Sequence, residues 1–373
     1  MTEQTIPTQI TNVLMESIGK IALHSEDVRP LEDGEFFIKT LYSGISAGTE
    51  LTFFLGTNPK ASEGFDPKRR LFRSDLEPDL EDIFPKLEGY MESGIVVDSK
   101  NPRFPVGTKV AGLYHHTSGH IANDNTLCVP LPDDFDPLLG IWVAKMGPIS
   151  MNGILFAADE IQRTKVTKLE GSLKGQRVIV YGAGMIGLLC GVFAKWAGAD
   201  DVVIVDGIAE RLEIAEKLGL TPFTAKPGMA VELKDRWMTE DPKNTGADIA
   251  FQCTGSDYLL SEALSCLREQ GTVVDLGFYQ SNATQLFLGK EFHHNCLRHV
   301  CAQIGSIPRA QQDLWSRKRL SEETINFMQK HGEELKKHLV THVLPFEKAQ
   351  EAFDGLAARN PEMLQVVLQP EEK

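Results

Sequence analysis

The feature that most constrains the fold is a glycine-rich turn between two apolar runs, all within about thirty residues. The run 178–181 leads into the sequence GAGMIG at 182–187, a segment rich in Leu, Ala and Gly follows, and a second run ends at Asp206. This order predicts a strand, a turn, a helix and a second strand. In such a unit the first glycine permits a tight turn, the second lets the backbone approach a pyrophosphate, and the third lets the helix pack closely on the sheet.

These residues predict a dinucleotide site. The helix that begins after the turn offers free N–H groups and a positive dipole end to phosphates. Asp206 stands about twenty residues beyond the turn, where a carboxylate accepts ribose hydroxyls and repels a 2′-phosphate. NAD is therefore the expected cofactor, and NADP is the less favoured alternative because Arg211 lies close by in sequence. The predicted cofactor-binding residues are Gly182, Gly184, Met185, Ile186, Gly187, Asp206, Arg211, Thr254, Gly277 and Phe278, of which the last three follow later strands.

Size and charge exclude several other classes of protein. The chain has 373 residues, enough for two domains, and a net charge of −14, which disfavours binding to nucleic acid. No run of about eighteen apolar residues is present, so no membrane span is expected. The N-terminus lacks a basic and then apolar signal, and none of the six cysteines forms a CxxC pair. We expect a cytoplasmic protein without disulfides.

The chain changes character near residue 146. Residues 1–146 hold short alternating runs separated by turns, at 36–44, 94–98 and 109–114, and predict a β-rich domain. Residues 57–88 are charged, contain prolines and lack a clear period, which predicts a long surface excursion. A helix is expected at 147–164. From there the strands and helices alternate as in a parallel α/β domain.

The whole layout resembles the medium-chain dehydrogenase/reductase superfamily, which contains the zinc alcohol dehydrogenases. The matching segments are 43–51, 89–98, 104–113, 182–187, 253–255 and 341–354. The first of them contains the sequence GTE, which resembles the subgroup of bacteriochlorophyllide, sugar and cyclitol dehydrogenases. The resemblance implies an α/β fold with a GroES-like substrate domain, residues 1–146 and 311–373, and a Rossmann domain, residues 147–310. It also implies a small-molecule substrate and a homodimer joined through the edge strands of the Rossmann domain, with a tetramer as the alternative.

The zinc ligands of that family are missing. Ser46 or Ala47 stands where zinc-dependent members carry a Cys, and Tyr90 replaces the His of a GHE motif; the third ligand position falls at 146–148, and residues 98–112 hold no Cys for a structural zinc. We therefore expect no metal. Zinc lowers the pKa of bound water from about 15.7 to about 7. A chain without zinc needs a side chain that takes the proton or donors that hold the oxyanion.

Five residues are candidates for the proton, and the sequence does not rank them firmly. His116 could face the cleft as acid or base. Lys145 precedes the crossing between domains, where a lysine beside a nicotinamide could act as a base. Tyr90 could donate to the substrate oxygen or fill the empty zinc pocket. Thr49 could relay a proton, and Glu50 could orient neighbours or bind substrate hydroxyls.

The other histidines are weaker candidates. His115 and His116 are adjacent, so on a strand they point to opposite faces, and together with His120 they do not predict a metal site. His293 and His294 follow the last loop of the Rossmann domain, where a structural role is favoured over a functional one.

Three functions are compatible with these features. The favoured one is a zinc-independent, NAD-dependent dehydrogenase that interconverts a secondary alcohol, on a polyol, sugar or cyclic substrate, and a ketone. The second is an NADPH-dependent quinone or enone reductase, although such proteins usually lack an acid at the position of Asp206. The third is a protein that binds NAD(H) without catalysis.

Overall fold

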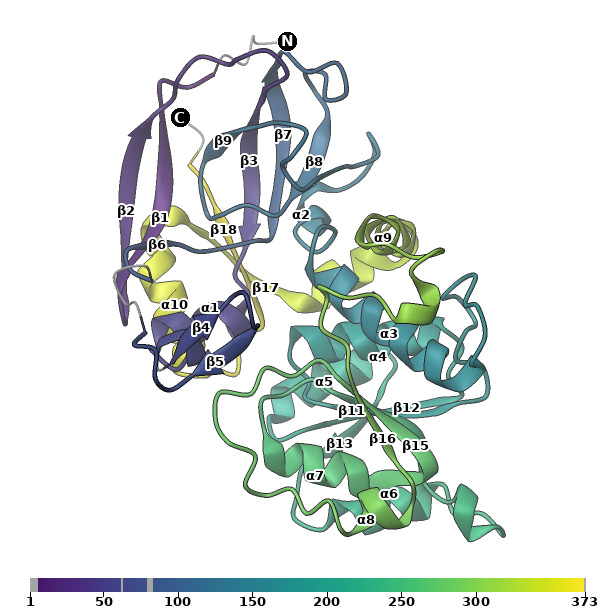
Figure 1. Cartoon of the computed structure of the whole chain (residues 1–373). Helices are drawn as coiled ribbons and strands as arrows, with labels where there is room; N and C mark the ends of the chain where they lie inside the picture. Colours follow the sequence, from purple (N-terminus) through teal and green to yellow (C-terminus); the bar gives the residue numbers. More distant parts are fainter. Residues whose placement is uncertain (1–5, 62, 79–82, 372–373) are drawn as a thin grey trace. The chain divides into compact units, whose positions relative to one another are not determined.

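The computed structural model describes residues 6–61, 63–78 and 83–371. The chain divides into two compact units, residues 1–145 with 327–373 and residues 146–326. The predicted fold class is confirmed, because one unit contains a parallel sheet with helices and the other an antiparallel β structure (Figure 1). The domain limits expected from sequence, with a boundary at 310/311, stay a prediction; the division between the compact units falls within α9 (Arg317–Leu339).

The unit 146–326 is built on a six-stranded sheet in the order β13-β12-β11-β14-β15-β16. All five neighbouring pairs are parallel. The strand order reverses between β11 and β14, and ligands of such sheets bind outside the carboxyl ends of the strands at this point. The strands are β11 (Arg177–Tyr181), β12 (Asp201–Asp206), β13 (Thr221–Thr224), β14 (Ala247–Gln252), β15 (Leu267–Asp275) and β16 (Arg298–Cys301).

Helices cover this sheet because its central strands are apolar on both faces. Helix α3 packs on α4, and α6 packs on α7; Figure 1 shows these two pairs on opposite sides of the strands. Ile179, Val203 and Val273 lie in the buried core that results. The helices are α3 (Met146–Gln162), α4 (Met185–Trp196), α5 (Ala209–Lys217), α6 (Met229–Arg236), α7 (Asp257–Cys266) and α8 (Glu291–His294), with 3₁₀ turns at Pro242–Asn244 and Arg309–Gln311.

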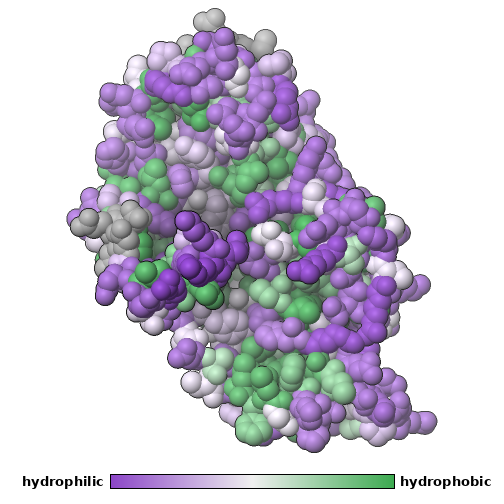
Figure 2. Space-filling model, in the orientation of Figure 1, coloured by the Kyte–Doolittle hydropathy of each residue, from purple (hydrophilic) through white to green (hydrophobic). Residues whose placement is uncertain are grey.

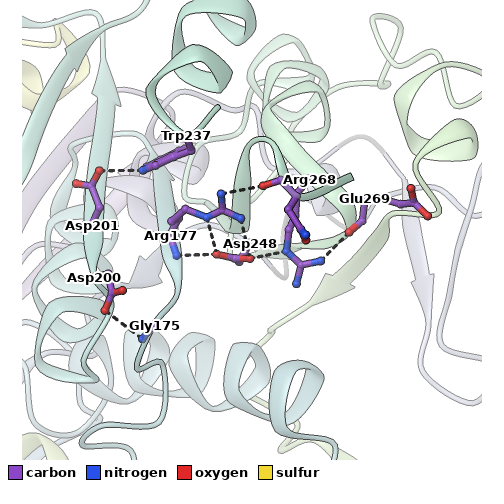
Figure 3. Close-up of polar contacts among 9 residues, drawn as sticks. Gly175, Arg177, Asp200, Asp201, Trp237, Asp248, Arg268 and Glu269 are labelled. Atoms are coloured by element: carbon purple, nitrogen blue, oxygen red, sulfur yellow. Dashed lines mark hydrogen bonds and ion pairs between the residues drawn. The ribbon is translucent and has the colours of Figure 1, made fainter. Parts of the chain in front are cut away.

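A buried carboxylate joins three neighbouring strands at the opposite edge of this sheet from the glycine turn (Figure 3). Asp248, near the start of β14, accepts hydrogen bonds from Arg177 N at 2.8 Å and Arg177 Nε at 3.1 Å, and a further one from Arg268 Nε. Burial alone would raise the pKa of Asp248, but the two arginines hold this pKa below its ordinary value. The hydrogen bonds that Asp248 accepts come from the protein itself, so we assign this cluster a structural role.

The other unit is mainly antiparallel. A seven-stranded sheet has the order β10-β8-β7-β3-β18-β17 with β9 also on β3, and a smaller sheet has the order β2-β1-β6. The strands are β1 (Gln9–Ser17), β2 (Lys20–Asp27), β3 (Phe36–Gly44), β4 (Gly64–Asp66), β5 (Leu71–Arg73), β6 (Lys86–Leu87), β7 (Glu92–Ser99), β8 (Lys109–Gly112), β9 (Gly119–Ala122), β10 (Cys128–Pro130), β17 (Val340–Pro345) and β18 (Gln365–Gln369).

The C-terminal segment completes this unit. Strand β18 pairs with β3 across more than three hundred residues of chain, with Leu368 opposite Ser43. Helix α10 packs on α1, and the rings of Phe54 and Phe353 lie 5.4 Å apart in the core they share. The helices are α1 (Ala47–Phe54), α2 (Pro137–Gly140) and α10 (Ala349–Ala357), with 3₁₀ turns at Pro59–Ala61 and Phe346–Lys348.

The predicted surface excursion, residues 57–88, contains a short hairpin made by β4 and β5. Phe65, Leu71 and Phe72 are 39%, 54% and 47% exposed on it. On the other unit, Phe287 and Leu288 are exposed, shortly after Thr284 and Gln285, whose backbone N–H groups donate to Asp257 at the start of α7. Figure 2 shows hydrophobic residues gathered on the lower part of the molecule, over the unit with the parallel sheet. Among the helices that the structure describes, none has the length and apolar character that a membrane crossing requires.

Candidate active site and dinucleotide site

The glycine turn lies between β11 and α4, as the sequence predicts, and two of its glycines cannot be replaced without strain. Gly182 has φ +98°, a conformation that favours glycine. A Cβ on Gly187 would lie 1.7 Å from the carbonyl oxygen of Gly182, so only a glycine lets the helix begin so close to the turn. At Gly184, by contrast, a Cβ would meet nothing within 4 Å. The turn is therefore packed on its inner side and open at Gly184.

The open side carries hydrogen-bond donors. Gly184 is the N-cap of α4, and no side chain caps this helix. Met185 and Ile186 open the helix and are half-buried. The first N–H groups of a helix lack partners within the helix, and together with the helix dipole they bind phosphate. These residues fit the pyrophosphate of a dinucleotide.

Asp206 ends β12, next to the turn. One carboxylate oxygen accepts a hydrogen bond from Ala183 N at 2.6 Å, and the other accepts one from Ile208 N at 2.8 Å. The backbone of the turn thus holds the carboxylate at the carboxyl edge of the sheet. Arg211, on α5, has a buried Nε without a hydrogen-bond partner among the described residues. An unsatisfied buried donor is costly, which suits a site that a ligand completes.

The loops after β14 and β15 meet beside the turn. A Cβ on Gly182 would lie 2.6 Å from Thr254 Cγ2, and a Cβ on Gly277 would lie 2.0 Å from the carbonyl oxygen of Thr254. The hydroxyl of Thr254 donates to Gln252 Oε1 at 3.1 Å, and Phe278 is 44% exposed. The structure therefore brings the predicted cofactor residues of β11, β12, β14 and β15 to one edge of one sheet.

In the other unit, three hydroxyl groups gather around Ser46 and Tyr90, two of the positions where the sequence resemblance places zinc ligands. The hydroxyls of Ser46 and Tyr90 are in direct hydrogen-bond contact, and Tyr90 OH donates to Thr49 Oγ1 at 3.3 Å. Ser46 is the N-cap of α1, yet its side chain does not cap the helix. We call Ser46, Thr49 and Tyr90 the hydroxyl cluster.

A buried carboxylate and imidazole lie behind the hydroxyl cluster. Glu50 Oε1 accepts a hydrogen bond from Ser46 N at 2.8 Å, and Glu50 Oε2 lies 2.8 Å from His116 Nε2. His116 Nδ1 lies 2.7 Å from the hydroxyl of Ser43. Both Glu50 and His116 are fully buried, with 0% exposure. Each polar atom of this pair is therefore satisfied inside the protein.

The backbone around His116 is tightly held. His116 N donates to Glu88 O at 2.8 Å, and Val13 N donates to His116 O at 2.8 Å. Gly89 has φ +110°, and a Cβ there would lie 2.8 Å from His116 N, so only glycine fits between Glu88 and Tyr90. Burial raises the pKa of the Glu88 carboxyl.

Tyr90 and Lys145 are half-buried, which distinguishes them from Glu50 and His116. Burial and the nearby Glu50 carboxylate raise the pKa of the Tyr90 phenol to about 12, so it is neutral at ordinary pH. Lys145 Nζ lies 5.6 Å from the centre of the Tyr90 ring. A cation over an aromatic face is attracted by the ring.

The remaining histidines lie elsewhere. His120, on β9, is 2.9 Å from Glu92 Oε2, its ring stacks on Tyr114 at 3.5 Å, and Thr40 donates to Glu92 Oε1 at 2.8 Å. His293 and His294 are exposed on α8. Sequence reasoning missed Ser43 and Glu92. No alternation along β3 or β7 marks these two residues, because their neighbours in the strands are also buried or half-buried.

Zinc does not fit these residues. Among the residues that the structure describes, no three His, Cys, Asp or Glu side chains are grouped so as to hold a metal ion. The hydroxyl cluster offers Ser, Thr and Tyr, which are not the usual ligands of zinc, and the two buried histidines are each paired with one glutamate.

Comparisons with known proteins agree with this fold. A family model described as Zinc-binding dehydrogenase matches residues 186–312, a span in the unit with the parallel sheet that excludes the hydroxyl cluster. D-xylulose reductase A of Aspergillus niger is 31% identical over 194 residues, 52% of this chain and 50% of that protein. The chain thus spans about half the length of this curated relative.

Another relative matches more of the chain. D-guloside 3-dehydrogenase of Shigella flexneri is 27% identical over 350 residues, 91% of this chain and 94% of that protein. Among solved structures, 2R,3R-butanediol dehydrogenase from Bacillus subtilis is 18% identical with a TM-score of 0.71, over 97% of this chain and all of that one. At that identity the structural likeness concerns the fold alone.

Proposed function

We propose that this chain, a member of the medium-chain dehydrogenase/reductase superfamily, is an NAD-dependent oxidoreductase that interconverts a secondary alcohol and a ketone without zinc. The observation that carries the proposal is the hydroxyl cluster, where Ser46 and Tyr90, at positions that the resemblance assigns to metal ligands, are hydrogen-bonded to each other and Tyr90 is hydrogen-bonded to Thr49. These hydroxyls can donate to a substrate oxygen and so perform the task that a metal performs in zinc-dependent members.

The choice of NAD rests on Asp206. Its carboxylate is held by two backbone N–H groups at the edge of the sheet, where it would accept hydrogen bonds from ribose hydroxyls and repel a 2′-phosphate. Gly184 and the uncapped start of α4 would hold the pyrophosphate, and Thr254, Gly277 and Phe278 would border the rest of the crevice. When bound, the nicotinamide supplies or accepts the hydride.

Sugars and polyols are the proposed substrates. The relatives at 27–31% identity include proteins named for D-xylulose and for a D-guloside. A cluster of neutral hydroxyls beside a buried carboxylate suits a substrate rich in hydroxyl groups, since such groups both donate and accept.

The test is direct. NADH and NADPH are titrated against the purified protein by fluorescence, and turnover is measured with NAD plus xylitol, sorbitol or 2,3-butanediol, and with NADH plus D-xylulose or D-fructose. The proposal expects tighter binding of NADH and turnover of at least one polyol and ketose pair. Reduction of an activated double bond with a preference for NADPH would instead indicate a quinone or enone reductase. Tight NADH binding without any turnover would indicate a protein that only binds the cofactor.

A homodimer belongs to the same proposal. Strand β16 is at the edge of the six-stranded sheet, where a second copy could add its own strand. Light scattering should give twice the chain mass of 41.3 kDa. A monomer mass at micromolar concentration would contradict the dimer and leave the chemistry untouched.

A further inference from the structure

We propose that Tyr90, Ser46 and Lys145 form the proton-transfer group: the Tyr90 hydroxyl exchanges a proton with the substrate oxygen, Ser46 positions that hydroxyl, and the Lys145 ammonium stabilises the phenolate. This inference rests on the proposed oxidoreductase function and gives each residue of the site a separate role. Three observations carry it, namely the direction of the Ser46 side chain, the difference in burial among the polar residues, and the position of Lys145 against the Tyr90 ring.

The Ser46 hydroxyl does not cap helix α1, although Ser46 is the N-cap residue. Serine is a preferred N-cap because its oxygen accepts a hydrogen bond from the first turn of the helix. In α1 this bond is absent; the Ser46 hydroxyl contacts Tyr90 OH, while Glu50 Oε1 accepts the Ser46 backbone N–H at 2.8 Å. Helix α1 thus forgoes a capping bond, and the serine orients the phenol.

Burial separates the direct from the indirect participants. Glu50 and His116 have 0% exposure, so neither can contact a substrate. They act as positioning residues, because Glu50 holds the backbone N–H of Ser46 and His116 holds Glu50. Tyr90, Thr49 and Lys145 are half-buried and retain accessible surface. Of the two accessible hydroxyl groups, the phenol is the stronger acid, because an aliphatic hydroxyl such as that of Thr49 ionises far less readily.

Lys145 faces the ring whose charge changes. Its Nζ lies 5.6 Å from the ring centre of Tyr90, within the range of a cation–π contact. A phenolate spreads negative charge over that ring, so an ammonium in this position stabilises the phenolate more than the phenol. The lysine therefore favours the form of Tyr90 that exists after it has given up its proton.

The step balances without any further reagent. In ketone reduction a bound reduced nicotinamide would supply the hydride, with its electron pair, that the carbonyl carbon accepts. As the carbonyl oxygen becomes negative, the O–H bond of Tyr90 breaks and its proton forms the O–H bond of the alcohol. Tyr90 is left as the phenolate, hydrogen-bonded by Ser46 and Thr49 and facing Lys145, and water returns the proton. Alcohol oxidation reverses each of these transfers.

This assignment predicts a pH profile. The phenol, with its pKa raised to about 12 by burial and by Glu50, stays protonated at neutral pH and is ready to donate. Reduction should therefore change little between pH 7 and pH 9, roughly. Oxidation needs the phenolate, so its kcat/KM should rise about tenfold per pH unit over the same range.

The experiment uses the full chain with the polyol and ketose pair that gives the most turnover. Tyr90→Phe should lower kcat at least about a hundredfold and abolish the pH slope of oxidation, with the NADH dissociation constant unchanged. Lys145→Met should lower kcat more than Lys145→Arg, which keeps the charge. Ser46→Ala should lower kcat about tenfold or more. Tyr114→Phe is the matched control, since it keeps the ring that stacks on His120 and should leave kcat unchanged.

The outcomes are distinguishable. If the wild-type protein turns over and Tyr90→Phe folds, binds NADH and keeps its rate, the inference is overturned and the oxidoreductase function stands. If Tyr90→Phe does not fold, two other results decide. Equal kcat values for Lys145→Met and Lys145→Arg, together with a kcat/KM of oxidation that does not change with pH in the wild type, would overturn the inference. A wild-type protein that turns over no member of the panel overturns both the inference and the proposed function.

Discussion

The buried pair of Glu50 and His116 allows a quantitative prediction about stability. Both side chains have 0% exposure and are joined at 2.8 Å, and each has one further partner, Ser46 N and the Ser43 hydroxyl. Removal of one member of a buried pair leaves the other as an unpaired polar group or charge, at a cost of about 3–5 kcal/mol. Glu50→Ala and His116→Ala should each destabilise the protein by that amount. For a domain of this size the loss corresponds to roughly 6–20 °C in Tm.

The double variant separates pairing from packing. If the cost comes from the orphaned partner, Glu50→Ala/His116→Ala should be about as stable as the worse single variant, which gives a coupling free energy of about 3 kcal/mol. The matched control is the exposed pair of Glu16 and Lys20, joined at 2.6 Å on the surface, where the same cycle should give about 0–1 kcal/mol. Calorimetry and urea denaturation measure both cycles. Additive losses in the buried cycle would refute the reasoning, because the two side chains would then contribute independently.

Three further predictions concern the unit with the parallel sheet. Gly184→Ala should leave the Tm nearly unchanged and weaken NADH binding at least about tenfold, whereas Gly187→Ala should cost at least about 1–3 kcal/mol of stability, because its Cβ would overlap the Gly182 carbonyl. Calorimetry and NADH titration check both variants. Equal effects of the two substitutions would contradict the assignment of Gly184 to the open, phosphate-facing side of the turn. Asp206→Ala should reduce the preference for NAD over NADP by about ten- to hundredfold, measured as the ratio of kcat/KM values; an unchanged ratio would mean that Asp206 does not contact the ribose. Asp248→Asn should unfold more easily than the wild type at pH 7. The pKa of Asp248 is lowered in the folded state, so its contribution to stability is complete above the unfolded value of about 3.9 and is lost as the pH falls through the lower, folded value. The difference between the two proteins should therefore begin to shrink as the pH falls below about 4. A constant difference in urea midpoints from pH 7 to pH 3, roughly, would refute that assignment.

The dinucleotide turn could be predicted from the sequence because its requirements are local. Gly182 needs its left-handed φ and Gly187 needs the absence of a Cβ, and both needs arise within six residues of chain. Strand β3 was predicted at its observed limits, Phe36–Gly44, because a short run rich in aromatic and apolar residues ends at a glycine, although its burial does not alternate strictly. The hairpin of β4 and β5 was not predicted, since strands of three residues with basic residues between them show no period.

The hydroxyl cluster shows the limit of sequence reasoning. The resemblance to a known family assigned Ser46, Tyr90 and Glu50 to one site. The sequence does not indicate, however, that the Ser46 hydroxyl contacts Tyr90 and leaves its own helix uncapped. Likewise, the sequence favours His116 among the three histidines between 115 and 120 but does not show which side chains each of them meets. Their partners decide among them: Glu50 for His116 and Glu92 for His120, from strands and helices distant in the chain.

The central claim is that side-chain hydroxyls, rather than a metal ion, handle the proton in the proposed reaction. The most direct measurement is turnover per chain before and after exhaustive chelation, with the metal content of each sample determined by elemental analysis. The account predicts the same turnover in both samples and no dependence on metal content. Turnover that falls with the removed zinc and returns on its addition would contradict the account.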